Sequence, residues 1–179
     1  MTESLQHNYN NGAIIPGDLI ARPVYLDRVI PFIGKSLVKV FTGQRRVGKS
    51  YLLYQVMNHV LEHEPEAQIL YINKEDLAFS AMRTGKDLHD YVLANKADVA
   101  MTYVFIDEIQ DIVEFEDALR SLLLHKNMDL YCTGSNANML SGDVAGKLSG
   151  RCIEISVFSL SYLEFLQFHK LENNGQSLE

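Results

Sequence analysis

The sequence has little cysteine, no long apolar run and no excess of basic residues. Its 179 residues contain two cysteines, Cys132 and Cys152, too few for a disulfide framework and not spaced as a zinc site. No N-terminal stretch resembles a signal peptide, and no stretch is long and apolar enough to span a bilayer. These absences predict a cytoplasmic protein without membrane association.

The charge balance argues against general nucleic-acid binding. The chain holds 16 basic and 23 acidic residues, a formal net charge of −7, whereas nucleic-acid-binding domains usually present a basic face. The charge is uneven, because residues 1–51 contain seven basic and three acidic residues, a net of +4. This N-terminal third is either a solvated surface or a basic patch for a polyphosphate or a partner, so a DNA-associated role stays open.

Hydrophobic patterning predicts strands that alternate with helices. Apolar strands are expected at 37–41, 68–72, 103–106, 130–133 and 152–157, and helices at 25–33, 49–61, 87–94 and 115–123. A capping box, Ser161-x-x-Glu164, starts a last helix, and residues 173–175 are expected to end it. Such alternation is typical of an α/β fold with a parallel sheet covered on both faces, which binds ligands beyond the carboxyl ends of its strands.

Residues 43–50 match the phosphate-loop pattern G-x-x-x-x-G-K-[ST], between an apolar strand and an amphipathic helix. Backbone N–H groups of such a loop converge on phosphate oxygens, the lysine reaches the β- and γ-phosphates, and the hydroxyl binds magnesium. The predicted nucleotide-binding residues are Gly43, Gln44, Arg45, Arg46, Val47, Gly48, Lys49, Ser50 and Tyr51. Whether Arg45 and Arg46 touch phosphate or face solvent stays open.

Two carboxylates follow the third predicted strand. Asp107 at the strand end is expected to hold magnesium together with Ser50, and Glu108 to polarise an attacking water as a general base. P-loop kinases and GTPases generally lack the second acid, so the pair indicates hydrolysis. Gln110 either positions water or relays nucleotide state, or is a surface glutamine.

The fourth and fifth strands supply two further candidates. Thr133-Gly-Ser135-Asn136 follows the fourth strand, where Ser135 or Asn136 is a candidate γ-phosphate sensor, although the same residues are also turn formers. Arg151 opens the fifth strand and is either a catalytic arginine, for its own or for a neighbouring subunit's nucleotide, or part of a salt bridge.

The ordered motifs RRVGKS, FIDEIQ, LRSL, TGSN and LSGR together resemble a family of AAA-like bacterial and archaeal ATPases of the additional-strand P-loop division. The resemblance runs from about residue 25 to 165. It implies a three-layer sandwich with a five-stranded parallel sheet in the order 5-1-4-3-2, ATP as the nucleotide, and magnesium. It also implies Lys49 and Ser50 as phosphate and metal ligands, Asp107 as the metal carboxylate and Glu108 as the base.

The composition and the resemblance together predict a domain organisation. Residues 1–18 are polar and turn-rich, so we expect a flexible arm there, followed by a P-loop ATPase domain at 19–170 and a tail at 171–179. The resemblance also implies a second, C-terminal domain, because family members usually continue into one, and this sequence ends before it at Glu179. In this strand order the first strand separates Cys132 from Cys152 and places them at opposite ends of the sheet, which predicts free, buried thiols.

The leading hypothesis is magnesium-dependent ATP hydrolysis that drives a conformational switch, with Lys49, Glu108, Asn136 and Arg151 as catalytic residues. The alternative is an ATP-binding switch or scaffold with little hydrolysis of its own. That alternative requires an arginine from another copy of the chain, a partner protein or the absent domain. A phosphate-transferring kinase is disfavoured by the acidic pair.

Overall fold

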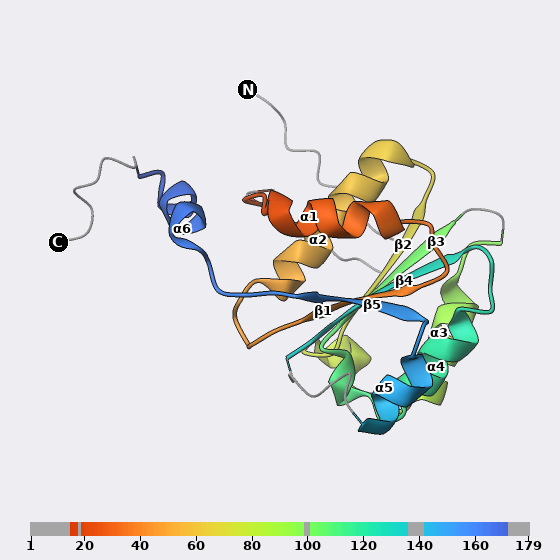
Figure 1. Cartoon of the computed structure of the whole chain (residues 1–179). Helices are drawn as coiled ribbons and strands as arrows, with labels where there is room; N and C mark the ends of the chain where they lie inside the picture. Colours follow the sequence, from red (N-terminus) through yellow and green to blue (C-terminus); the bar gives the residue numbers. More distant parts are fainter. Residues whose placement is uncertain (1–14, 18, 99–100, 136–141, 172–179) are drawn as a thin grey trace.

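The computed structural model describes residues 15–17, 19–98, 101–135 and 142–171. In these ranges five strands form one parallel sheet in the order β2-β3-β4-β1-β5 (Figure 1). The strands are β1 (Val38–Thr42), β2 (Gln68–Asn73), β3 (Thr102–Asp107), β4 (Met128–Gly134) and β5 (Cys152–Ser156). This is the predicted order read from the opposite edge, so the predicted sheet is confirmed.

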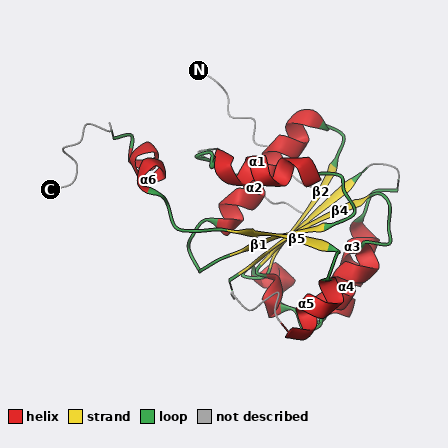
Figure 2. Ribbon diagram, viewed as in Figure 1, coloured by secondary structure: helices red, strands yellow, loops and turns green. Residues whose placement is uncertain are grey.

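Helices cover both faces of the sheet. One face carries α1 (Pro23–Val29) and α2 (Lys49–His63), and the other carries α3 (Gly85–Asn95), α4 (Phe115–Leu122) and α5 (Gly142–Leu148) (Figures 1 and 2). The last helix, α6 (Tyr162–His169), stands apart from both layers beyond β5. Three short 3-10 helices, η1 (Ile30–Phe32), η2 (Leu77–Phe79) and η3 (Ile109–Asp111), lie in the connections.

The alternation of side chains along the strands divides the core into two clusters. In β1, Val40 packs in the cluster under α3 and α4, whereas its neighbour Phe41 packs under α1 and α2. Every residue of β1, β3 and β4 is buried, as expected of central strands in a parallel sheet. The sheet therefore holds the loops at its carboxyl edge on a rigid base.

A buried ion pair fixes the amino end of β1. Lys39 donates to Asp129 and to the carbonyl of Lys35 (2.9 Å), and both charged side chains are fully buried. Asp129 also accepts hydrogen bonds from the Tyr131 hydroxyl (2.7 Å) and the Gly34 amide (2.8 Å). This second set of bonds compensates for the desolvation of the carboxylate. Burial still lowers the pKa of Lys39, and Asp129 opposes that shift.

Both thiols are free, as predicted, but their placement differs from the prediction. Cys132 pairs with Val40 and Cys152 with Val38 on the other side of β1, so the cysteines are two residues apart in register rather than at opposite ends. Cys132 is buried, whereas Cys152 is only half-buried because β5 is an edge strand. The intervening strand is enough to prevent a disulfide.

Two helix predictions need correction. Helix α5 is absent from the predicted elements; its two glycines disfavour a helix, yet Lys147 pairs with Glu116 (2.9 Å) and Asp117 (3.0 Å) of α4. Helix α6 starts at the predicted capping box but ends at His169, because Lys170 takes a left-handed conformation. The expected terminator at 173–175 lies outside the described residues.

The predicted domain boundaries concern partly undescribed residues. Of the arm expected at 1–18, residues 1–14 and 18 lie outside the description, while Ile15 is buried in the core cluster under α1 and α2. Of the tail expected at 171–179, only Leu171 is described. No helix in the described ranges is long and apolar enough to cross a membrane.

Candidate active site

The predicted site residues converge at the carboxyl edge of the sheet. The phosphate loop follows β1, the acidic pair follows β3, and Ser135 follows β4, which lies between them. Parallel strands end at the same edge, so residues between 27 and 86 positions apart in the sequence are brought into contact.

Glycine geometry gives the phosphate loop its shape. Gly43 has φ 151°, and a Cβ there would lie 2.3 Å from the Val157 carbonyl oxygen, so the position admits no side chain. Gly48 (φ 95°) and Arg46 (φ 66°) are also left-handed. Gly48 precedes α2, which begins without a side-chain cap, so its first N–H groups face the loop as donors for an anion.

Lys49 lies under this loop with 4% of its surface exposed. Its ammonium donates to the carbonyls of Gly43 (3.1 Å) and Gln44 (2.9 Å) and to the hydroxyl of Ser135 (3.1 Å). The ammonium also lies 3.8 Å from the Glu108 carboxylate. Burial lowers the pKa of Lys49, and the negative charge of Glu108 partly offsets this shift.

The carboxylate of Asp107 is oriented by two hydroxyl groups. It accepts from Tyr71 of β2 (3.1 Å) and from Thr133 of β4. Burial and the charge of Asp107 raise the pKa of Tyr71, which keeps this hydroxyl a donor. The Thr133 hydroxyl also accepts from the Glu108 amide (2.9 Å). Tyr71 and Thr133 are not among the predicted site residues; both lie towards the carboxyl ends of β2 and β4, the strands that flank β3.

Glu108 is held by its backbone and by two polar neighbours. Its φ of 57° is left-handed, a conformation that costs a non-glycine residue about 1 kcal/mol. The Ser135 hydroxyl lies 2.6 and 2.5 Å from the two carboxylate oxygens, and the Gln110 amide donates to one of them (2.6 Å). Gln110 also accepts from the Ser135 amide (3.3 Å), so it belongs to the site rather than to a solvated surface.

The available oxygen donors fit a magnesium ion that shares phosphate ligands. Ser50 is half-buried in the first turn of α2 and lines a cavity with Lys49 and Glu108, and the charge of the oriented Asp107 carboxylate acts on Lys49. Such hard oxygen ligands suit magnesium, which usually completes its coordination with phosphate and water. The described residues contain no group of three acidic, histidine or cysteine side chains that would hold a metal alone.

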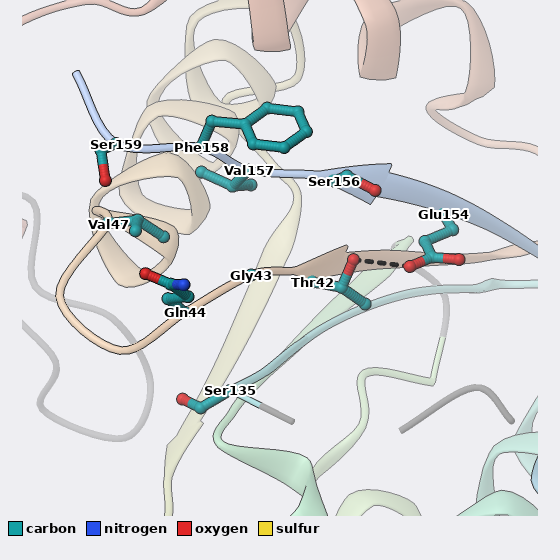
Figure 3. Close-up of a pocket in the computed structure, with 10 residues that line it drawn as sticks. All are labelled: Thr42, Gly43, Gln44, Val47, Ser135, Glu154, Ser156, Val157, Phe158 and Ser159. Atoms are coloured by element: carbon teal, nitrogen blue, oxygen red, sulfur yellow. Dashed lines mark hydrogen bonds between the residues drawn. The ribbon is translucent and has the colours of Figure 1, made fainter. Parts of the chain in front are cut away.

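Three cavities surround the phosphate loop. The first, about 580 Å³, contains Lys49, Ser50, Glu75 and Glu108 together with the arginines of the loop. The second, about 570 Å³, lies on the β5 side and contains Ser135 and Glu154, which accepts from Thr42 at 2.6 Å (Figure 3). The third, about 370 Å³, is lined by Ile20, Arg22, Arg46, Val47, Gly48, Tyr51, Gln55, Leu160 and Phe168.

The two remaining candidates are placed differently. Asn136 lies outside the described residues. Arg151 is exposed at the amino end of β5, and its guanidinium donates to the Lys147 carbonyl (3.4 Å). The five residues of β5 separate Arg151 by about 16 Å from the edge that carries the phosphate loop. Arg151 forms no ion pair with any residue that the structure describes.

A family model described as an AAA domain matches residues 35–166. The chain belongs to this AAA domain family. The matched range contains the phosphate loop, the acidic pair and Arg151, and the fold is that of an AAA-family ATPase domain.

Two curated relatives are both uncharacterised proteins. The Haemophilus influenzae relative is 32% identical over 163 residues, which are 90% of this chain and 41% of the relative. MJ1544 of Methanocaldococcus jannaschii is 32% identical over 133 residues, covering 73% of this chain and 28% of the relative. The chain thus spans less than half the length of either relative.

Solved structures share the fold at low sequence identity. Aeropyrum pernix ORC2 matches 83% of this chain and 48% of its own, with 16% identity and a TM-score of 0.58. Saccharomyces cerevisiae Hsp104, solved with casein, matches 85% of this chain and 29% of its own, with 16% identity and a TM-score of 0.62. These likenesses show a common fold.

Proposed function

We propose that this AAA domain binds ATP with magnesium and hydrolyses it, and that the cycle drives a conformational switch. The observation that carries the proposal is the position of the Glu108 carboxylate, 3.8 Å from the Lys49 ammonium at the mouth of the phosphate loop. A binding module needs the loop and the lysine, whereas a carboxylate beside them supplies a base for water.

Phosphate binding would use the loop from Gly43 to Ser50. The uncapped N-terminus of α2 and the left-handed loop residues direct N–H groups towards an anion. Lys49 would exchange its carbonyl acceptors for phosphate oxygens and neutralise charge that develops on the γ-phosphate. Ser50 and Asp107 would hold magnesium, which supplies further neutralisation of phosphate charge when bound.

Hydrolysis would use Glu108 as the base. Ser135 and Gln110 fix the carboxylate through hydrogen bonds, so it is oriented before a water arrives. Ser135 also contacts Lys49, which makes it the described residue best placed to respond to the γ-phosphate. Asn136 stays a second candidate for this role.

The third cavity fits the nucleotide base. Its walls are mainly apolar, with Val47 from the loop, Leu160 and Phe168 from the C-terminal segment, and Tyr51, whose ring is half exposed. An aromatic base can stack against such walls. Gln55 is not available to read the base, because its side chain is bonded to the carbonyl of Ile20 (3.0 Å) and the amide of Arg22 (2.9 Å).

A second candidate function is a nucleotide switch that hydrolyses only in an assembly. Arg151 is exposed at the sheet edge opposite its own phosphate loop, so it is accessible to another copy of the chain. An arginine that enters a neighbour's site stabilises charge in phosphoryl transfer. In this case an isolated chain binds ATP but turns it over slowly.

The deciding experiment compares phosphate release by the parent chain and by Glu108→Gln at saturating ATP and magnesium. We expect the substitution to keep ATP binding and to slow release by about 10²- to 10⁴-fold, the usual contribution of a general base. Glu66→Gln, at an exposed glutamate remote from the site, is the matched control. Equal turnover in parent and Glu108→Gln would refute the assignment, and binding without turnover in the parent would favour the assembly-dependent switch.

A further inference from the structure

Arg22 joins three segments that are distant in the sequence. Its guanidinium donates to the Val47 carbonyl of the phosphate loop (2.8 Å), to the Phe158 carbonyl after β5 (3.0 Å) and to the Glu164 carboxylate of α6 (2.7 Å). Only 2% of Arg22 is exposed. A charged side chain is rarely buried so completely, and here each of its nitrogens has an acceptor.

Helix α6 has few other attachments to the body of the domain. It lies beyond β5, apart from both helical layers (Figures 1 and 2), and Leu166 is its one buried side chain. The Arg22–Glu164 pair is the only ion pair that links α6 to the rest of the described chain. Glu164 also accepts from the Ser161 amide (2.8 Å) in the capping box. The same carboxylate therefore caps the N-terminus of α6 and attaches the helix to Arg22.

The segments that the Arg22–Glu164 ion pair connects also line one cavity. Arg22, Val47 and Gly48 line the cavity of about 370 Å³ from the loop side, whereas Phe168 lines it from α6 and Leu160 from the segment just before that helix. The position of α6 therefore sets the width of this cavity. Lys49, Glu108 and Ser135 belong to the other two cavities and do not line this one.

We propose that Arg22 and Glu164 are positioning residues that hold α6 as the outer wall of the base cavity, so that base binding and the position of α6 are coupled. The inference rests on the proposed function, because it takes the nucleotide base as the occupant. Arg22 connects the phosphate loop to α6, because its guanidinium donates to the Val47 carbonyl and to the Glu164 carboxylate at the same time. Releasing Glu164 frees α6 without removing a ligand of the phosphates.

The test separates the base from the phosphates. In Glu164→Gln the side chain keeps its length and can still accept from the Ser161 amide, but it loses its charge. We expect the dissociation constant and KM for ATP to rise about tenfold, as expected for the loss of one charge-assisted hydrogen bond. Inorganic tripolyphosphate, which has no base, should bind parent and variant equally, and kcat should stay within about twofold because the base cavity lies outside the reacting centre.

Two further variants make the result specific. Phe168→Ala removes part of the cavity wall without touching Arg22, and should also weaken ATP while leaving tripolyphosphate unchanged. Glu62→Gln, at an exposed glutamate of α2, should change neither ligand. Melting temperatures show which variants fold. If Glu164→Gln does not fold, the comparison of ATP and tripolyphosphate is made with Phe168→Ala.

The outcomes distinguish failure of the proposed coupling from failure of the proposed ATPase function. Parent-like ATP binding by either folded variant, or an equal loss of ATP and tripolyphosphate, would overturn the coupling while leaving the ATPase intact. Failure of the parent to bind ATP at all would overturn the proposed function, and the inference with it.

Discussion

The Lys49 ammonium and the Glu108 carboxylate lie 3.8 Å apart, and the Ser135 hydroxyl is bonded to both. This arrangement joins the proposed phosphate-binding cation to the proposed base through a single hydroxyl group. A phosphate that engages Lys49 competes with Glu108 for the ammonium, which would release the carboxylate towards an attacking water. The contact therefore offers a physical route from nucleotide binding to activation of the base.

Ser135→Ala tests this bridge. Removing the hydroxyl leaves Glu108 with Gln110 as its remaining side-chain donor and frees one donor of Lys49. We expect kcat for phosphate release to fall by about 10- to 100-fold, while ATP still binds through the loop. Ser149→Ala, at an exposed serine before β5, is the control. Parent-like kcat in Ser135→Ala would show that the bridge has no part in turnover.

Thr133→Val tests the support of the metal carboxylate. The substitution keeps the shape of the side chain but removes the donor to Asp107 and the acceptor of the Glu108 amide. We expect the magnesium concentration for half-maximal phosphate release to rise about tenfold and the free energy of unfolding to fall by about 1–3 kcal/mol. A magnesium titration and urea unfolding measure the two effects. An unchanged magnesium requirement would mean that Asp107 needs no such orientation.

Much of the fold and part of the site could be predicted from the sequence, because both depend on local patterns. Apolar runs of strand length and the phosphate-loop motif gave the alternating architecture, and the ordered motifs gave the strand order through a family resemblance. Helix α5 could not be predicted, because ion pairs to α4 stabilise it and its helix propensity is low. The roles of Thr133 and Tyr71 could not be predicted, because each hydroxyl donates to Asp107 on the neighbouring strand and nothing local in the sequence indicates that contact.

The N-terminal charge illustrates a further limit of sequence patterns. The basic excess of residues 1–51 suggested a possible surface patch, but three of its seven basic residues are buried. Arg22 and Lys39 are paired with Glu164 and Asp129, and Lys49 lies under the phosphate loop. A count of charged residues does not show which of them are paired. The acidic partners of these three residues, Glu164, Asp129 and Glu108, lie at least 59 residues away in the sequence.

Substitution of the Lys39–Asp129 pair tests whether it stabilises the fold. Lys39→Met leaves a buried carboxylate without its cation and should lower the free energy of unfolding by about 3–5 kcal/mol. The double variant with Asp129→Leu removes the uncompensated charge and should recover part of that loss. Urea unfolding of the single and double variants gives the coupling. A double variant less stable than Lys39→Met would show that the remaining partners of Asp129, rather than the ion pair, stabilise this end of the sheet.

Acid titration tests the charge of Glu164. The hydrogen bond from Arg22 is the main reason that the pKa of Glu164 falls from 4.5 to about 2. A carboxyl with a lowered folded-state pKa contributes stability above its unfolded pKa, and that contribution is lost as the pH falls from 4.5 towards 2. The stability difference between the parent and Glu164→Gln should therefore shrink by roughly 1–3 kcal/mol over this window. A difference that is independent of pH would show that the charge of Glu164 does not stabilise the fold.

Mixing two inactive variants tests whether Arg151 acts in a neighbouring site. Arg151 lies at the amino end of β5 and Glu108 at the carboxyl end of β3, so one chain cannot bring both to its own nucleotide if the sheet stays intact. Arg151→Ala and Glu108→Gln should each be slowed at least about 100-fold when alone. In a random equimolar assembly with head-to-tail contacts, about a quarter of the sites combine an intact Glu108 with an intact arginine from the adjacent copy. Phosphate release should therefore recover to about a quarter of the parent rate. A mixture as inactive as its components would mean that Arg151 does not complete a neighbour's site.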